Sequence, residues 1–195
     1  MWKQLRISVV VLGFMTLLTG GLYPLVVTVV AQTLASHKAI GSLMSQHDNT
    51  VGSELIGQSF SKPEYFWGRL SATGTVPFNA AASSGSNFGP LHADLAKNAK
   101  DRIEALRRSD PTIESVPVDL VTASASGLDP HISPTAAQVQ VKRVANSRKM
   151  TEDEVQQLVA TCTEERQFGV LGEPRVNVLR LNLALDAHAG KLSGR

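Results

Sequence analysis

A long apolar run at the start of the chain divides the sequence into two parts. No charged residue occurs between Arg6 and His37, and the most apolar stretch of this run is Ile7–Val30. A helix of these 24 residues would be about 36 Å long, slightly more than the ~30 Å hydrocarbon core of a bilayer. We therefore predict one transmembrane helix at residues 7–30.

Small residues and a proline interrupt this run at Gly13, Gly20, Gly21 and Pro24. They are tolerated in a membrane helix because neighbouring helices can satisfy freed backbone groups, and small residues allow helices to approach closely. We predict a kink near Tyr23–Pro24 and helix packing through the three glycines.

The same region admits a second interpretation, a cleaved signal peptide. Lys3 and Arg6 would form its basic start, Ile7–Leu18 its apolar core, and Val29–Ala31 its cleavage site. The apolar run continues well past Pro24, however, beyond the roughly 7–15 residues of a signal core. Retention as a membrane anchor is therefore the favoured interpretation.

The charges beside the run predict the orientation of the anchor. Lys3 and Arg6 precede it, whereas only His37 and Lys38 follow it closely. Because cytoplasmic flanks carry the excess of Lys and Arg, we expect residues 1–6 in the cytoplasm. We then expect a connector at residues 31–50, an extracytoplasmic domain at 51–187 and a frayed tail at 188–195.

Helical periodicity recurs three times in the second part of the chain. The first stripe begins after Pro90, with Ser86 or Asn87 as a nearby cap, and ends near Ser109. It comprises Leu91, Leu95, Ala99, Ile103 and Leu106. The second begins at the Ser133–Pro134 pair and carries Ala137, Val141 and Val144.

The third helix starts with a capping box, in which Thr151 and Glu154 satisfy each other's backbone donors. Its stripe consists of Val155, Leu158, Val159 and Cys162. Cys162 is the single cysteine, so the chain cannot form an internal disulfide, and its place on the stripe predicts a core position.

Alternation of apolar residues predicts two strands. One covers Val116–Thr122, and the other runs from Val176 to Leu185 with a change of phase that indicates a bulge. Residues Ser53–Gln58 fit a short strand or turn. The fold class expected is an α+β soluble domain with one N-terminal transmembrane helix.

Composition and motifs exclude several classes of function. From His37 onward, 17 Lys and Arg (19 minus Lys3 and Arg6) face 17 Asp and Glu, so no basic patch indicates nucleic-acid binding. The chain has no phosphate-binding Gly-rich loop, no His-x-x-x-His pair and no Gly-x-Ser-x-Gly elbow. We expect no metal site and no catalytic residue.

Two groups of polar residues allow either a structural or a functional interpretation. Asp129–Pro130 fits an Asx turn, although Asp129 with Ser126 and His131 could also serve an anchored extracytoplasmic enzyme. Arg143 and Arg148 could bind an anion, but residues beside an apolar stripe more often cover it with their stems. A membrane-anchored binding module is a third alternative.

Several longer motifs occur in one order along the chain. They are GSELIGQSF at Gly52–Phe60, FWGR at Phe66–Arg69, SSGSN at Ser83–Asn87, TASASGLDPHIS at Thr122–Ser133 and VNV at Val176–Val178. In this order the chain resembles the C subunits of Kdp-type potassium-transporting ATPases, from the apolar run to about Asp186.

The resemblance implies a high-affinity potassium uptake complex in a bacterial inner membrane. Its other members would be a channel-like A subunit, a P-type ATPase B subunit and a small F subunit, and the catalytic aspartate would lie outside this chain. The C subunit would support assembly and stability, or act as a chaperone that raises the ATP affinity of the B subunit. No cofactor would be tightly bound, and ATP would be bound only jointly with the B subunit.

The resemblance also assigns roles to particular residues. Gln140 corresponds to a glutamine linked to nucleotide in the family, although the family often has proline where Lys142 stands. We expect docking to other subunits, or structural loops, at residues that are mostly small and polar. These are Ser84, Gly85, Ser86, Asn87, Ser126, Gly127, Asp129, Arg143 and Asn177.

Overall fold

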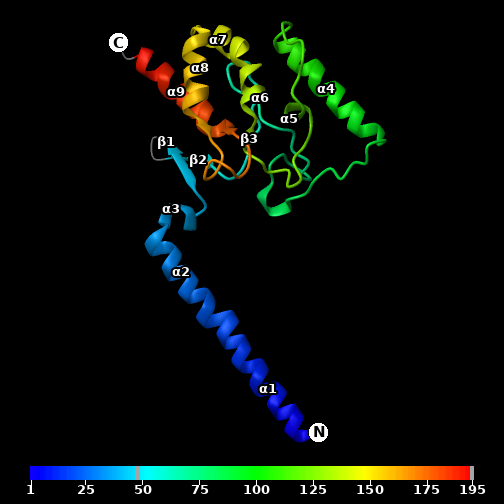
Figure 1. Cartoon of the computed structure of the whole chain (residues 1–195), viewed down its shortest axis with the longest axis vertical. Coiled ribbons are helices and arrows are strands. Elements are labelled where there is room, and N and C mark those ends of the chain that lie inside the picture. The colour runs from blue at the N-terminus through cyan, green and yellow to red at the C-terminus, as the bar shows by residue number, and fades with distance from the viewer. Residues whose placement is uncertain (47–48, 194–195) are drawn as a thin grey trace. The chain divides into compact units, whose positions relative to one another are not determined.

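The computed structural model describes residues 1–46 and 49–193, with side chains up to His188. The chain forms two compact units, Met1–Val51 and Gly52–Arg195. Together they contain helices and two small sheets (Figure 1). The α+β class and the single N-terminal helix predicted from sequence are therefore confirmed.

The first unit is dominated by one continuous helix of 33 residues, Trp2–Leu34. It consists of α1 (Trp2–Leu17), a π-helical turn η1 (Leu18–Leu22) and α2 (Tyr23–Leu34) (Figure 1). By length and composition it can cross a membrane. The predicted residues 7–30 lie inside it.

The π-helical turn coincides with the glycines and lies directly before Pro24. The Tyr23 N–H donates to the carbonyl of Leu18, five residues earlier. Because Pro24 has no N–H, the regular hydrogen-bond pattern must be broken there, and a π turn is one way to do so. We predicted a kink at Tyr23–Pro24, and the structure places this turn immediately before it.

Short elements follow the long helix in the first unit. They are α3 (Ser36–Ala39) and the paired strands β1 (Leu43–Gln46) and β2 (Asn49–Ser53). The predicted connector, residues 31–50, thus contains regular structure, and its residues 47–48 lie outside the described part of the chain.

The second unit places a three-stranded antiparallel sheet among helices. The sheet has the order β3 (His131–Ile132), β5 (Arg175–Asn177), β4 (Thr163–Glu164), with His131 opposite Asn177 and Thr163 opposite Val176. Around it lie helices α6, α7, α8 and α9 (Figure 1). Their bounds are α6 (Pro134–Gln138), α7 (Val141–Arg148), α8 (Glu152–Thr161) and α9 (Val178–Ser193).

Three further helices complete this unit. They are the 3-10 turn η2 (Ala80–Ala82), α4 (Ala93–Ser109) and the short α5 (Val118–Val121). The core contains fully buried side chains from many segments, including Phe66, Leu106, Leu120, Val176, Leu181 and Leu185. Helix α4 buries Leu106 fully, while Leu95, Ala99 and Ile103 of the predicted stripe are half-buried.

Helix starts predicted from caps are largely confirmed. Ser133 accepts a hydrogen bond from Ala136 N at 3.0 Å, and Thr151 forms the capping box with Glu154. The second predicted helix is divided, however, because α6 ends at Gln138 and α7 begins at Val141. Helix α4 begins at Ala93, later than predicted from Pro90, and His92 caps it.

Neither of the two strands predicted from alternation forms over its predicted length. Residues Val118–Val121, inside the predicted strand, form the helix α5, which starts after Pro117. The predicted bulged strand at Val176–Leu185 is strand only to Asn177 and then becomes α9, because its buried side chains also fit helical spacing at Val178, Leu181 and Leu185. The predicted tail is helical as far as Ser193, and residues 194–195 lie outside the description.

Candidate functional site

Three loops that are far apart in sequence meet on the second unit. We call residues 71–79, 83–87 and 124–131 the loop cluster. Ser84 N donates to Ser126 O at 3.1 Å, and Ser83 Oγ donates to the same carbonyl at 3.0 Å. Ser71 Oγ donates to Gly127 O at 2.7 Å. The predicted residues Ser84–Asn87 and Ser126–Asp129 therefore belong to one surface.

Glycines allow these loops to approach so closely. Gly127 has φ +68°, and a Cβ placed on it would lie 2.6 Å from Ser84 O. A Cβ on Gly85 would lie 2.8 Å from Ala125 O. A left-handed conformation and backbone contact both require a residue without a side chain, so Gly85 and Gly127 set the shape of the cluster.

Asp129 lies at the edge of the cluster beside Arg69 and His131. Its carboxylate pairs with Arg69 at 3.2 Å and accepts from His131 N at 2.9 Å, while the His131 ring nitrogen Nδ1 lies at 3.2 Å. Burial would raise the pKa of Asp129, but the His131 hydrogen bonds and the charge of Arg69 outweigh it and hold the pKa below its usual value. The predicted Asx turn is therefore present.

The hydroxyl groups of Ser124 and Ser126 in the loop cluster accept hydrogen bonds from backbone N–H groups. Ser126 Oγ accepts from Leu128 N at 3.2 Å, and Ser124 Oγ accepts from Asp129 N at 3.5 Å. Within the described residues neither serine hydroxyl bonds to His131. The arrangement that the enzyme alternative needs, a serine bonded to a base, is not formed.

Gln140 lies in the buried turn between α6 and α7, and its side chain is 0% exposed. Its Oε1 accepts from Trp67 N at 2.8 Å and from Arg143 at 2.7 Å. Its Nε2 donates to Trp67 O at 3.1 Å and to Ala136 O at 3.0 Å. Both amide protons and the amide oxygen are thus used inside the protein.

Arg143 extends this network to the segment before Trp67. Its guanidinium donates to the carbonyls of Pro63 and Tyr65, and it lies 4.7 Å from the centre of the Trp67 ring. Burial, opposed by the attraction of Asp110, lowers the pKa of Arg143 to about 10. Arg143 therefore fixes residues 63–67 through its guanidinium.

Arg102 of α4 also lies beside Trp67. It lies 5.0 Å from the Trp67 ring centre and donates to Gly68 O at 2.9 Å and to Leu120 O at 3.2 Å. Burial lowers its pKa. The sequence contained a signal for this role, because Arg102 is spaced i+7 from Leu95 and so occupies the apolar stripe of α4.

Two asparagines bind the C-terminal helix to the rest of the domain. Asn177 Nδ2 donates to Glu54 O at 2.8 Å, and its Oδ1 accepts from Arg180 N at 3.1 Å. Asn182 is bonded to both backbone groups of Phe66, at 2.9 and 3.1 Å. Asn177 was predicted as a residue of a subunit contact or a structural loop, whereas Asn182 was missed despite being a polar residue within an apolar run.

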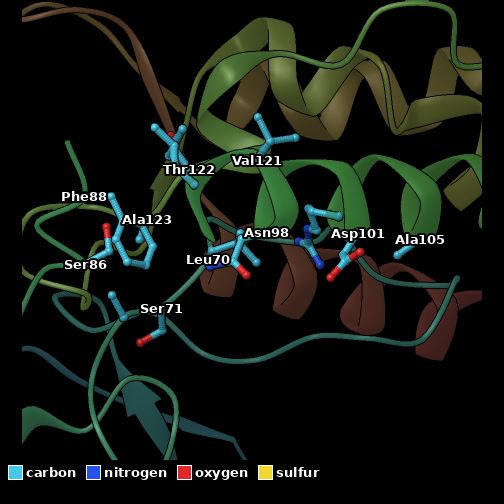
Figure 2. A pocket seen from close by; sticks show the side chains of 13 residues that line it. Leu70, Ser71, Ser86, Phe88, Asn98, Asp101, Ala105, Val121, Thr122 and Ala123 are labelled. Carbon is cyan, nitrogen blue, oxygen red and sulfur yellow. The ribbon is translucent and has the colours of Figure 1, made fainter. Parts of the chain in front are cut away.

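A cleft of about 540 Å³ opens beside the loop cluster. Leu70, Phe88 and Val121 give it apolar walls, and Asn98 and Asp101 of α4 form a polar edge (Figure 2). It adjoins the half-buried face of α4 and includes Ser86 from the loop cluster. Among the described residues, no group of three or more His, Cys, Asp or Glu side chains is placed to hold a metal ion.

The predicted packing residues of the long helix are open to their surroundings. A Cβ on Gly13, Gly20 or Gly21 would meet no atom within 4 Å apart from its chain neighbours and the adjacent backbone of its own helix. Two hydroxyls of this helix bond to its own backbone, since Thr19 donates to Met15 O at 2.7 Å and Thr33 to Val29 O at 2.9 Å. The helix therefore offers small residues without exposing unpaired hydroxyls at these positions.

Comparisons with known proteins agree over nearly the whole chain. The family model described as "KdpC: K+-transporting ATPase, c chain" matches residues 5–187. Proteins named "Potassium-transporting ATPase KdpC subunit" are similar to this chain in several bacteria. The one from Herpetosiphon aurantiacus is 60% identical, over 88% of this chain and 89% of its own length. The one from Burkholderia orbicola is 59% identical, over 94% and 95%, and that from Polynucleobacter asymbioticus 58%, over 89% and 93%.

Proposed function

The chain belongs to the KdpC family, the c chains of K+-transporting ATPases, and we propose that it is a non-catalytic accessory subunit of a high-affinity, ATP-driven potassium uptake complex. The observation that carries this proposal is the agreement along residues 5–187, which include both the apolar helix and the folded domain. The candidate catalytic groups Ser126 and Asp129 hold turns, which fits a subunit that leaves the chemistry to another chain.

The complex we infer contains a channel-like A subunit, a P-type ATPase B subunit and a small F subunit in a bacterial inner membrane. The chain would cross the membrane once, with its N-terminus in the cytoplasm and its domain outside. Lys3 and Arg6 on the N-terminal side of the helix support this orientation. Gly13, Gly20, Gly21 and Pro24 would lie where the helix packs on its neighbours.

We assign docking of the domain to the loop cluster. Ser84, Ser86, Asn87 and Ser126 are exposed there, while the backbone beneath them is fixed by hydrogen bonds between the loops. A surface that is ordered before binding loses less conformational entropy when a partner docks. The cluster therefore suits a stable contact within an assembly.

For Gln140 we propose a structural role, with any effect on ATP transmitted through the fold. Its amide already makes four hydrogen bonds in the interior, so a nucleotide could reach it only after Trp67 had moved away. Binding of ATP would be a property of the B subunit, with no cofactor tightly bound by this chain. Chaperone action remains the second role that the family implies.

The experiment is purification of the complex from cells that express all its subunits, with an affinity tag on this chain. Ser86→Arg places a long charged side chain on the loop cluster, and Ser147→Arg makes the same change at an exposed position of α7. We expect Ser86→Arg to lower recovery of the A and B subunits at least fivefold and Ser147→Arg to leave it unchanged. Equal recovery with both variants would refute docking through the loop cluster.

A further inference from the structure

The N-terminal end of α1 combines two basic side chains with two apolar grooves. Lys3 and Arg6 are three positions apart in the helix, so they lie on one face with their Cβ atoms about 5–6 Å apart. One groove, of about 530 Å³, is lined by Trp2, Lys3, Leu5, Arg6, Val9 and Val10. The other, of about 500 Å³, is lined by Lys3, Arg6, Ile7, Val10 and Val11. Both grooves therefore contain the same pair of cations and continue along apolar residues.

The two cations have no acidic partner within the described part of the chain. Neither Lys3 nor Arg6 forms an ion pair with any described residue. In the sequence, no acidic residue precedes Asp48, which lies beyond the apolar run. The positive charge at this end of the helix is thus available to an anion from outside the chain.

The proposed membrane span determines the surroundings of this end of the helix. The apolar run starts at Ile7, directly after Arg6, so the two cations lie at the level of the lipid headgroups and Val10 lies in the hydrocarbon region. Trp2 is 85% exposed, and tryptophan is enriched at the headgroup level of membrane proteins. A molecule that contacts both the cations and the grooves must be anionic at one end and apolar at the other.

We propose that Lys3 and Arg6 bind the phosphate of an anionic phospholipid, whose two acyl chains lie in the two grooves that share Val10. This proposal rests on the proposed function, because it requires the helix to span a membrane. The guanidinium of Arg6 matches a phosphate with two parallel donors, and Lys3 adds a second charge. A zwitterionic lipid carries a cation in its own headgroup, so the pair favours a lipid of net negative charge such as phosphatidylglycerol.

The first test measures which lipid lies beside Trp2 in the full-length chain. The chain is reconstituted into phosphatidylcholine vesicles that contain a minor fraction of phosphatidylglycerol. Quenching of tryptophan fluorescence is then compared between phosphatidylglycerol and phosphatidylcholine, each brominated on its acyl chains and present at the same mole fraction. Trp67 is buried in the second unit, so quenching by acyl-chain bromine reports on Trp2.

We expect phosphatidylglycerol to be enriched about fivefold or more beside Trp2, since each basic residue near an anionic membrane surface contributes about that factor. The enrichment should fall as salt is added, because exposed charges are screened. Lys3→Gln combined with Arg6→Gln should abolish it, whereas the control Lys38→Gln, on the other flank of the apolar run, should leave it unchanged. Equal quenching by the two lipids, or a preference that survives the double substitution, would overturn the proposal.

The second test examines the assembled complex by native mass spectrometry after addition of phosphatidylglycerol. The complex with Lys3→Gln and Arg6→Gln should bind one molecule of this lipid fewer than the wild type. Lys3→Arg combined with Arg6→Lys keeps both charges and should retain the lipid. If the partner subunits copurify but the lipid count does not change, an acidic group of another subunit neutralises the pair instead, and the lipid site is refuted while the proposed function stands. Absence of the partners from the wild-type preparation would refute the proposed function, and the vesicle measurement would still decide lipid binding.

Discussion

Replacement of Gln140 by leucine separates a structural role from a nucleotide contact. Leucine is similar in volume but offers no hydrogen bonds, so the substitution leaves the Trp67 N–H, the Trp67 carbonyl and one Arg143 N–H without their partner. All three groups belong to buried residues. Each buried polar group left unsatisfied costs about 1–3 kcal/mol.

The sum predicts a large loss of stability. Taking the lower half of that range, three such groups cost roughly 3–6 kcal/mol, a substantial share of the 5–15 kcal/mol of a typical domain. At about 2–4 °C per kcal/mol for a protein of this size, the thermal midpoint should fall by roughly 6–24 °C. A residue that only touched a nucleotide would have little effect on the chain by itself.

The assay is thermal unfolding of the full-length chain in detergent, followed by near-ultraviolet circular dichroism. The guanidiniums of Arg102 and Arg143 lie 5.0 and 4.7 Å from the centre of the Trp67 ring, so the signal of Trp67 reports the loss of this arrangement. Gln138→Leu is the matched control, because Gln138 is exposed on α6. If Gln140→Leu melted within 2 °C of the wild type, the structural role assigned to Gln140 would be refuted.

Three further predictions concern the loop cluster and the orientation of the chain. Gly127→Ala should lower the free energy of unfolding by about 1–3 kcal/mol in thermal melts, because the new Cβ would meet Ser84 O at 2.6 Å. The pKa of Asp129 is lowered in the folded protein, so the stability that its ion pairing contributes is complete above the ordinary pKa near 3.8 and is lost as pH falls through the lower pKa of the folded state. Asp129→Asn should therefore flatten the decline of the thermal midpoint below about pH 4. Leu91→Cys, at a position 100% exposed, should react with a membrane-impermeant maleimide in intact spheroplasts when Cys162 is replaced by alanine.

Each of these predictions has its own control. Gly74→Ala should be tolerated, since a Cβ there meets nothing within 4 Å, and equal melting of the two glycine variants would contradict the close approach of the loops. The control for Asp129→Asn is Asp94→Asn, which changes an exposed side chain. If the thermal midpoint of Asp129→Asn depended on pH as in the wild type, the stabilisation assigned to ionised Asp129 would be refuted. Labelling only after lysis would place the domain in the cytoplasm.

Local signals in the sequence predicted what neighbouring residues determine. The caps at Ser133 and Thr151 were found because a cap and the backbone donor it satisfies are three residues apart. The apolar run predicted the long helix because length and composition suffice for that prediction. These features do not depend on the remainder of the fold.

The errors arose where one pattern fits two structures. Leu179, Leu181 and Leu185 alternate as in a strand, but Leu181 and Leu185 are also spaced as on a helix face. The residues between them are mostly good helix formers, and the packing of α9 on α8 favours the helix over the strand. Alternation by itself could not resolve this choice.

The candidate site was predictable as a set of residues but not as an arrangement. The sequence identified the loops at Ser84 and Ser126, yet their hydrogen bonds join segments about forty residues apart. Gln140 meets Trp67 across 73 positions. Such contacts follow from the path of the chain through the fold, which the spacing of residues within each motif does not contain.

The π-helical turn at Leu18–Leu22 has a consequence for how the anchor can contact its neighbours. A π turn accommodates one extra residue, and one residue of an α-helix corresponds to a rotation of about 100°. Side chains on either side of the turn are therefore rotated by about that angle relative to an uninterrupted helix. If the helix spans a bilayer, the stripe it presents in one leaflet is not continued in the other, so a single anchor can meet different neighbours at two depths.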